Sequence, residues 1–156
     1  NIVSRKEFSD FEFSWEWRMA AGGNNGIKYF VDEIRGNLGH EYQMLATSGN
    51  KAGKGSTAGF YAVLAPVDPP PVKLFPKVNS SRIRVQGYKV THWLNGRKVL
   101  EYSCGSKEVL ANVASSKFKK VAKFGEKLRA RLMLTDHGSE CAFRNLKIRE
   151  LKAAPE

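Results

Sequence analysis

The clearest pattern along the chain is an alternation of aromatic and polar residues over positions 10–19, DFEFSWEWRM. Neighbouring side chains of a strand point to opposite faces, so this period of two predicts a half-buried strand of an antiparallel sheet. Its buried face is expected to carry Phe11, Phe13, Trp15, Trp17 and Met19. The segment GGNNG at 22–26 predicts a turn, and IKYFV at 27–31 is its expected returning strand.

A further alternating segment is HEYQML at 40–45, which predicts a short strand. Alternation divides it between two faces, one with His40, Tyr42 and Met44 and the other with Glu41, Gln43 and Leu45. A polar pair such as Glu41 and Gln43 suits a ligand-lining surface as well as plain exposure to solvent. The pattern alone does not decide between these two interpretations.

From 46 to 81 the composition shifts to Gly, Ser, Lys and Pro, which predicts a long loop. Proline lacks the N–H that a central strand needs, so at most one short strand is expected there, around GFYAVL at 59–64. A long ordered loop in a compact domain is often part of a functional site.

The stretch YKVTHWLNGRKVLEY, residues 88–102, predicts two strands around a tight turn. Asn95 and Gly96 are typical of a type I′ turn, because both of its central residues need positive φ. His92 and Trp93 stand just before the turn and should point to opposite faces. His92 is therefore either a buried structural histidine or a residue that faces a ligand.

One convincing helix is expected around residues 106–120, capped by Ser106. Its apolar stripe would consist of Val109, Leu110, Val113 and Phe118. The segments RARLML and CAFRNLKIREL predict two final strands, separated by the turn TDHGSE at 135–140. Many short antiparallel strands with one helix indicate an all-β sandwich.

The chain carries 26 Lys and Arg against 15 Asp and Glu, a net charge of +11, which favours acidic partners or surfaces. Seven of these cations lie in 117–131, where only Glu126 opposes them. Interleaved aromatics and a known nucleic-acid reader are missing there, so a solvated helix face is favoured over nucleic-acid binding. No apolar run approaches the ~20 residues of a membrane span. Asn1 at the start and the lack of a signal peptide indicate a processed or trimmed product.

Common catalytic motifs such as G-x-S-x-G and H-E-x-x-H are absent, and Cys104 and Cys141 can form one disulfide or none. Catalysis would have to use scattered Glu, Asp, His and Arg side chains, a pattern that fits carbohydrate chemistry better than nucleotide chemistry. Asp136 beside His137 suggests an Asx turn or two groups that share a cavity. Arg144 has the same parity as Leu146 and Ile148, which suggests a structural ion pair or an arginine at the floor of a cleft.

Several segments occur in a characteristic order: FSDFEFSWEWRM, GGNNGIKY, HEYQML, the HWLNG hairpin, SSKF and LTDHGSECAFRNLKIREL. Together they closely resemble the 3-keto-disaccharide hydrolase domain family, formerly a domain of unknown function, from about residue 3 to 151. The resemblance implies a concanavalin-like jelly roll of two curved antiparallel sheets, with a carbohydrate cleft on the concave side. It also implies a single domain over 1–156 that lacks the family's N-terminal strands, and a bacterial protein of the periplasm or cell exterior.

The implied activity is cleavage of glycosides that carry a ketone at C3. The ketone acidifies the C2 hydrogen, so a base can remove it, the C1 substituent can leave, and water can then add. Two alternatives stay open: a non-catalytic module that binds carbohydrate or joins a larger assembly, and, with less support, a binder of an anionic polymer or nucleic acid.

Matched to the family's motifs, the expected cleft is lined by Glu41, Gln43, His92, His137 and Arg144. The resemblance implies a histidine, His92 or His137, as base, Glu41 as acid, and Arg144 as a cation at the ketone. Substrate binding would fall to Gln43, Asn24, Asp136, Asn145 and Trp93. A divalent metal held by Glu41 and His137 is an alternative source of charge stabilisation.

Three departures from the family pattern bear on activity. Thr135 replaces a glutamine, Ala46 and Thr47 replace aspartates, and Val78 replaces a tryptophan. Changed cleft residues favour the alternative in which this copy binds sugar without cleaving it.

Overall fold

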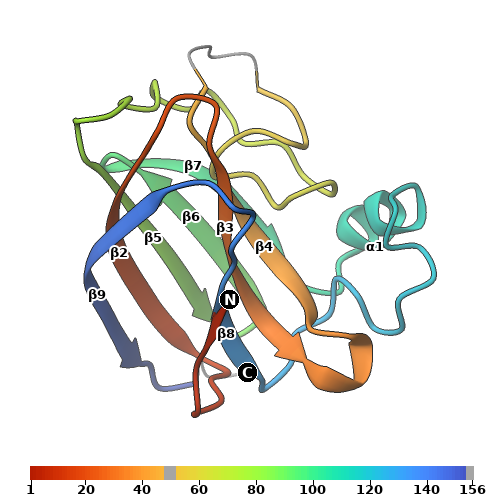
Figure 1. The fold of residues 1–156 in the computed structure, drawn as a ribbon. Coiled ribbons are helices and arrows are strands. Elements are labelled where there is room, and N and C mark those ends of the chain that lie inside the picture. The colour runs from red at the N-terminus through yellow and green to blue at the C-terminus, as the bar shows by residue number, and fades with distance from the viewer. Residues whose placement is uncertain (48–51, 154–156) are drawn as a thin grey trace.

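Two curved antiparallel sheets pack face to face in the computed structural model, which describes residues 1–47 and 52–153 (Figure 1). The four-stranded sheet has the order β1 (Ile2–Val3), β8 (Arg131–Leu134), β3 (Asn24–Asp32), β4 (Leu38–Leu45). The five-stranded sheet has the order β7 (Arg97–Ser103), β6 (Lys89–Leu94), β5 (Asn79–Gln86), β2 (Phe11–Met19), β9 (Cys141–Glu150). Two short helices complete the fold, η1 (Glu33–Arg35) and α1 (Lys107–Ala114). The all-β sandwich expected from the sequence is confirmed.

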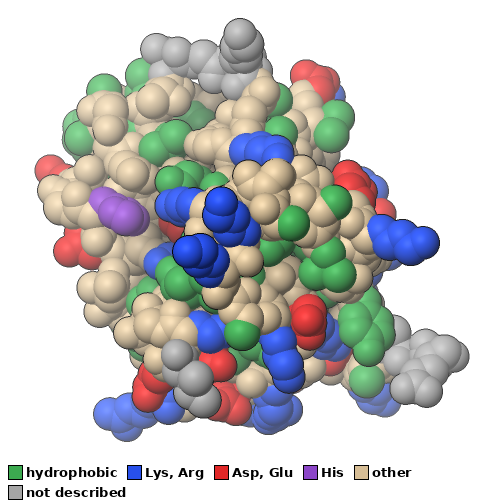
Figure 2. Space-filling view, turned by 90° about the vertical axis from the view of Figure 1, so that its right-hand side faces the viewer, with side chains coloured by type: hydrophobic (Ala, Val, Ile, Leu, Met, Phe, Trp, Pro, Cys, Tyr) green, Lys and Arg blue, Asp and Glu red, His purple; other side chains and the backbone are tan. Residues whose placement is uncertain are grey.

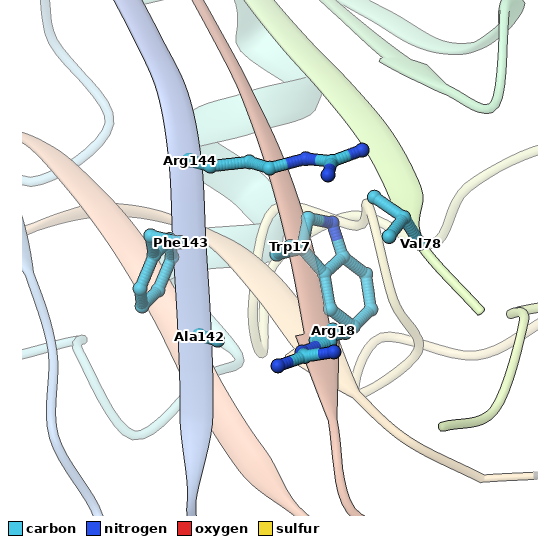
Figure 3. Close-up of a pocket in the computed structure, with 6 residues that line it drawn as sticks. All are labelled: Trp17, Arg18, Val78, Ala142, Phe143 and Arg144. Atoms are coloured by element: carbon cyan, nitrogen blue, oxygen red, sulfur yellow. The ribbon is translucent and has the colours of Figure 1, made fainter. Parts of the chain in front are cut away.

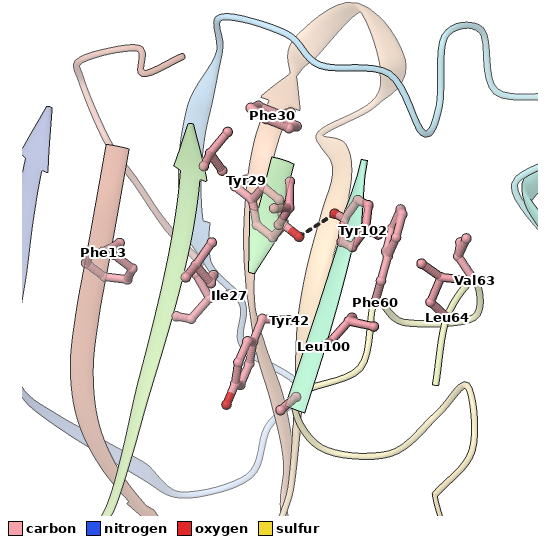
Figure 4. Close-up of a cluster of buried hydrophobic side chains, with 14 of the residues drawn as sticks. Phe13, Ile27, Tyr29, Phe30, Tyr42, Phe60, Val63, Leu64, Leu100 and Tyr102 are labelled. Atoms are coloured by element: carbon pink, nitrogen blue, oxygen red, sulfur yellow. Dashed lines mark hydrogen bonds between the residues drawn. The ribbon is translucent and has the colours of Figure 1, made fainter. Parts of the chain in front are cut away.

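Strand β2 lies between β5 and β9 in the five-stranded sheet and supplies much of the core. All five alternating apolar residues predicted for its inner face are buried. The Trp15 ring stacks on Phe13 at 5.2 Å between centroids and meets Tyr42 of the other sheet edge-on at 4.9 Å. Figure 4 shows how aromatic side chains from both sheets fill the space between them. The sandwich is therefore held together by aromatic packing across its two layers.

The segment after β2 was expected to return beside it, and this expectation is wrong. The chain crosses to the other sheet at 20–23, and β3 pairs with β4 and β8. Both edges of β2 are occupied by strands distant in sequence, β5 and β9. Strand β3 also begins earlier than predicted, at Asn24, so residues 24–26 belong to this strand rather than to a turn.

The hairpin of β6 and β7 forms as predicted. Asn95 and Gly96 both have positive φ, 48° and 84°. The Asn95 side chain also accepts a hydrogen bond from the Ser80 backbone N–H at 3.0 Å, which ties the turn to β5.

Helix α1 is shorter than the span around 106–120 that the sequence suggested. Ser106 caps it, since its hydroxyl accepts a hydrogen bond from the Val109 N–H. The helix ends at Ser115 and Ser116, whose hydroxyls bond to backbone carbonyls of the last turn and so compete with the helical pattern. Leu110 is 41% exposed and lies off the buried stripe, whereas Phe118 is buried by the turns that follow the helix.

The loop between β4 and β5 runs along the free edge of β4. Ala58 N–H donates to the Gln43 carbonyl at 2.9 Å, and Tyr61 N–H donates to the Glu41 carbonyl at 3.0 Å. The short strand suggested around 59–64 is reduced to isolated bridges of Phe60. These backbone bonds fix Tyr61 beside the outer surface of the four-stranded sheet.

The structure also bears on the cysteines, on membrane spans and on the basic segment. Cys104 and Cys141 are both free thiols. Within residues 1–47 and 52–153 there is no helix with the length and apolar character needed to cross a bilayer. The basic segment 117–131 is divided rather than continuous, because Lys127 pairs with Asp10 and Arg131 pairs with Glu33.

Candidate active site

A pocket of about 130 Å³ opens on the outer face of the four-stranded sheet. The inner residues of β3, such as Ile27 and Tyr29, fill the core, so alternation turns Asn24 and Lys28 outward. Strand β4 presents Glu41 and Gln43 to the same face. The complete lining is Asn24, Lys28, Leu38, Gly39, Glu41, Gln43, Tyr61, Lys117, Phe118 and His137.

Glu41 is the central ionisable group of this pocket. Glu41 is only 7% exposed, and this burial raises the pKa of its carboxyl. The nearby charges of Lys28, His137 and Lys117 oppose this shift without cancelling it. A carboxyl that keeps its proton to higher pH than usual is suited to act as a proton donor.

Gly26 makes room for the Glu41 carboxyl. It lies on β3 opposite Gln43, two positions from Lys28, the partner of Glu41. A Cβ atom at Gly26 would come within 2.4 Å of Glu41 Oε1. The glycine of this strand is therefore needed because a side chain of the neighbouring strand lies directly over it.

Two lysines give the pocket a positive rim. Lys28 stands opposite Glu41 in the β3–β4 register. Lys117 Nζ lies 4.2 Å from the centroid of the Tyr61 ring and hydrogen-bonds to the Tyr61 hydroxyl at 3.1 Å. Among the described residues neither lysine has a carboxylate within ion-pair distance. Both are available to an oxyanion of a ligand.

His137 reaches this pocket from the turn before β9. Asp136 beside it does not line the pocket, since its carboxylate accepts the Gly138 N–H at 2.8 Å in an Asx turn. The Ser139 hydroxyl accepts the Asn24 N–H at 3.2 Å and ties this turn to β3. His137 is the one exposed histidine of the three in the chain. Figure 2 shows a histidine side chain on the surface beside a group of Lys and Arg side chains.

His92 does not line the pocket, and its expected position in a cleft was wrong. It is 0% exposed and lies in the core between Val90 and Leu94, the other inward residues of β6. Burial lowers its pKa to about 4, so the imidazole is neutral at pH 7. Trp93 points to the outer face of the five-stranded sheet, where the Arg82 guanidinium lies 3.9 Å from its ring centroid. It is therefore also remote from the pocket.

His92 belongs to a buried chain of hydrogen bonds whose donors can be assigned. Its Nδ1–H donates to the Ala58 carbonyl at 2.9 Å, because a carbonyl can only accept. Its Nε2 then accepts from the Tyr29 hydroxyl at 2.8 Å, Tyr29 accepts from Tyr102 at 2.7 Å, and Tyr102 accepts from His40 Nδ1–H at 2.9 Å. Figure 4 shows the tyrosine pair. This series of hydrogen bonds anchors the loop at Ala58 to the core beneath the pocket.

Arg144 and Asn145 lie on the other sheet. A β-bulge shifts the β2–β9 register between Ser14 and Glu16, and Asn145 has φ of 52°. The bulge places Arg144 opposite Glu16 on the outer face, while Ile148 faces Phe13 on the core side. The shared face inferred from parity is therefore wrong. Arg144 Nε bonds to Glu16 at 2.6 Å and lowers the pKa of that carboxyl, as the ion-pair interpretation expected.

The pocket thus brings together four predicted residues, Asn24, Glu41, Gln43 and His137, and separates them from His92, Trp93, Arg144 and Asn145. It adds groups that sequence reasoning missed: Lys28, Tyr61, Lys117 and Phe118. Lys28 could have been predicted, because it lies four residues after Asn24 on the same strand and so points to the same face. Tyr61 and Lys117 come from segments whose path depends on tertiary packing.

The pocket does not by itself provide a metal centre. No cluster of three or more His, Cys, Asp or Glu side chains suited to a metal ion occurs in residues 1–47 and 52–153. Glu41 and His137 are thus two ligands without a third, whereas protein metal sites usually offer at least three.

Solved structures that share this fold include candidate glycosyl hydrolases and a carbohydrate-binding module. A candidate glycosyl hydrolase from Parabacteroides distasonis superposes with a TM-score of 0.84 at 27% identity, over 96% of this chain and 74% of that one. The carbohydrate-binding module CBM66 from Bacillus subtilis shares the fold alone, with a TM-score of 0.53 at 10% identity over 95% of this chain and 80% of the module. The chain thus has a β-sandwich fold like that of this candidate glycosyl hydrolase.

The family is also clear. Residues 1–149 match the 3-keto-alpha-glucoside-1,2-lyase-like domain, and the chain belongs to this family. A 3-keto-disaccharide hydrolase from Bacteroides thetaiotaomicron is 29% identical over 97% of the chain. The chain spans 62% of the length of that relative.

Proposed function

We propose that the Glu41 pocket cleaves glycosides of 3-keto sugars by elimination followed by hydration. The observation that carries this proposal is the convergence of Glu41, whose pKa is raised, with His137 and two lysines that lack ion-pair partners among the described residues. Such a set supplies a proton donor, a base and an oxyanion site within one small pocket. The family membership and the Bacteroides relative support the same substrate class.

In the first step His137 removes the proton on C2 of the sugar. The C2–H electron pair forms a C2=C3 double bond, and the ketone oxygen at C3 becomes an enolate oxygen. Lys28 and Lys117 stabilise that charge, a role that the family resemblance had implied for Arg144.

In the second step the enolate reforms the ketone and expels the oxygen at C1. Protonated Glu41 transfers its proton to this leaving oxygen, so the aglycone departs as an alcohol. The remaining sugar is an enone with a C1=C2 double bond. Water then adds at C1, C2 regains a proton, and the sum of the steps is hydrolysis.

The roles of Asn24 and Gln43 are to bind sugar hydroxyls. Both have amide side chains on the pocket wall, and an amide can donate and accept at once.

The test is turnover of a chromogenic 3-keto-glucoside by the wild type and by His137→Ala, Glu41→Gln and Asp136→Asn. The first two variants should lose about 100-fold or more in kcat, the range for a general acid or base. Asp136→Asn is the matched control, because Asp136 caps the turn without lining the pocket. Equal activity in all four proteins would remove the pocket from the reaction.

A second candidate function is sugar binding in the same pocket without cleavage. Thr135, which stands where the family has a glutamine, is buried, and its hydroxyl bonds to the Gly26 carbonyl and the Asn25 side chain. It therefore adds no polar group to the pocket. Saturable binding of the 3-keto-glucoside with no aglycone release, by a folded wild type, would favour this candidate.

A further inference from the structure

A second and larger hollow lies on the outer face of the five-stranded sheet. Its volume is about 300 Å³, and Figure 3 shows its lining: Trp17, Arg18, Val78, Ala142, Phe143 and Arg144. A neighbouring hollow of about 150 Å³ shares Arg18 and Ala142 with it and extends to Phe75 and Glu140. Because the two share these residues, they form one groove across the ends of β2 and β9.

Two guanidinium groups border this groove. Figure 3 shows the side chains of Arg18 and Arg144 extending to the same side of the two strands. Arg144 uses its Nε to bind Glu16, which leaves its terminal nitrogens for a ligand. Arg18 has no carboxylate within ion-pair distance among residues 1–47 and 52–153. Within this described part of the chain, Arg18 is therefore a cation without an ion pair, in a groove whose lining includes one acidic residue, Glu140.

Apart from Glu140 and the two arginines, the side chains that line the groove are apolar. Val78 and Ala142 are small residues of its wall. At its far end Phe75 is 57% exposed, and the Arg18 guanidinium lies 5.4 Å from its ring centroid. An aromatic face beside a guanidinium suits a ligand with an apolar ring face and one anionic group.

Positive charge continues from the groove across the same sheet. One cross-strand row carries Lys147, Ser14, Arg82, Trp93 and Lys98 on adjacent strands. Two of its three cations also have acidic neighbours, since Arg82 lies 3.9 Å from Glu12 and Lys98 lies 3.4 Å from Glu101. Neighbouring strands are about 4.8 Å apart, so these three cations are spread along a path of nearly 20 Å. Such a path matches a polymer with repeated negative charges better than it matches a single small anion.

We propose that this groove binds a uronate residue of an acidic polysaccharide, with the polymer continuing over the cationic row. The planar carboxylate of a uronate fits the fork of a guanidinium group, and the sugar ring lies over Val78 and Ala142 beside Phe75. The Glu41 pocket is on the opposite face of the sandwich. Binding to the polymer is consequently independent of the chemistry proposed for that pocket.

The test is a calorimetric titration with trigalacturonate, with neutral galactotriose as the ligand control. Arg18→Gln should lower the affinity for trigalacturonate about tenfold, the loss expected for one charge-assisted pair. Val78→Trp should abolish binding by filling the hollow, whereas Val78→Ala should keep it. Arg131→Gln is the matched arginine control, because Arg131 pairs with Glu33 away from the groove.

Three results would overturn the proposal. The first is affinity unchanged by Arg18→Gln, which decides the matter even where Val78→Trp fails to fold. The second is a loss of binding in Lys28→Gln instead, which would place the uronate in the Glu41 pocket. The third is tighter binding of galactotriose or of a sulfated heparin oligosaccharide than of trigalacturonate, which would exclude a uronate site.

Discussion

Acidification is expected to destabilise this protein well above the pH at which carboxylates titrate, because two histidines are buried in neutral form. Burial lowers the pKa of His92 to about 4 and that of His40 to about 3, against 6.5 for each in the unfolded chain. The unfolded state therefore binds more protons than the folded state between pH 6.5 and 4. Stability is full above pH 6.5 and is lost as pH falls through this window.

The magnitude at pH 5 depends little on the precise folded pKa values. Both lie below 5, so the folded histidines are still almost unprotonated there, while the unfolded ones are almost fully protonated. Each histidine then costs about 2 kcal/mol relative to pH 7.5, or about 4 kcal/mol for the pair. A domain of this size has a total stability of about 5–15 kcal/mol, so the loss is a large part of it.

The assay is urea denaturation at pH 7.5, 6.5, 5.5 and 5.0, for the wild type and for His92→Asn. The wild-type free energy of unfolding should fall by about 2–3 kcal/mol per pH unit below pH 6, which corresponds to about two protons. The variant should lose about half of this slope. Glu41, whose pKa is raised, acts in the opposite direction, but its contribution cancels in the comparison. Equal slopes in the two proteins would refute the inference that His92 is buried and neutral.

Three further outcomes are expected. Gly26→Ala should cost about 1–3 kcal/mol of stability by overpacking and should impair turnover, because its Cβ would displace the Glu41 carboxyl; normal activity by a folded variant would contradict this geometry. Lys28→Gln should lower kcat about 100-fold with little change in KM, because Lys28 is proposed to stabilise the enolate. Steady-state kinetics would measure both constants, with Lys6→Gln as the control because Lys6 does not line the pocket. Ser106→Ala should lower stability by about 1 kcal/mol, because α1 loses its N-cap. Thermal denaturation would measure this loss, and an unchanged melting midpoint would contradict the capping role of Ser106.

Local patterns predicted the elements of this fold well. The alternation in 10–19 identified the inner and outer faces of β2, and Asn95-Gly96 identified the hairpin, because both signals lie within a few residues. The length of α1 was less accessible, since Ser115 and Ser116 end the helix although the apolar spacing continues.

The candidate site was predicted only where its residues share one strand or one turn. Glu41 and Gln43 come from a single strand face, and their motif was visible in the sequence. His92 was misplaced because a strand has two faces, and the sequence does not state which of them meets the second sheet. Arg144 was misplaced because the bulge at Asn145 shifts the parity by one residue.

The sequence by itself determined the period of each strand, the turn chemistry and the membership of a carbohydrate-active family. Tertiary structure decided which sheet each strand joins, and therefore which polar side chains meet. Strand pairing depends on contacts between distant segments, as when β2 lies between β5 and β9. Lys28, Lys117 and His137 surround Glu41 only because three separate segments pack on one sheet face, and no local pattern carries that information.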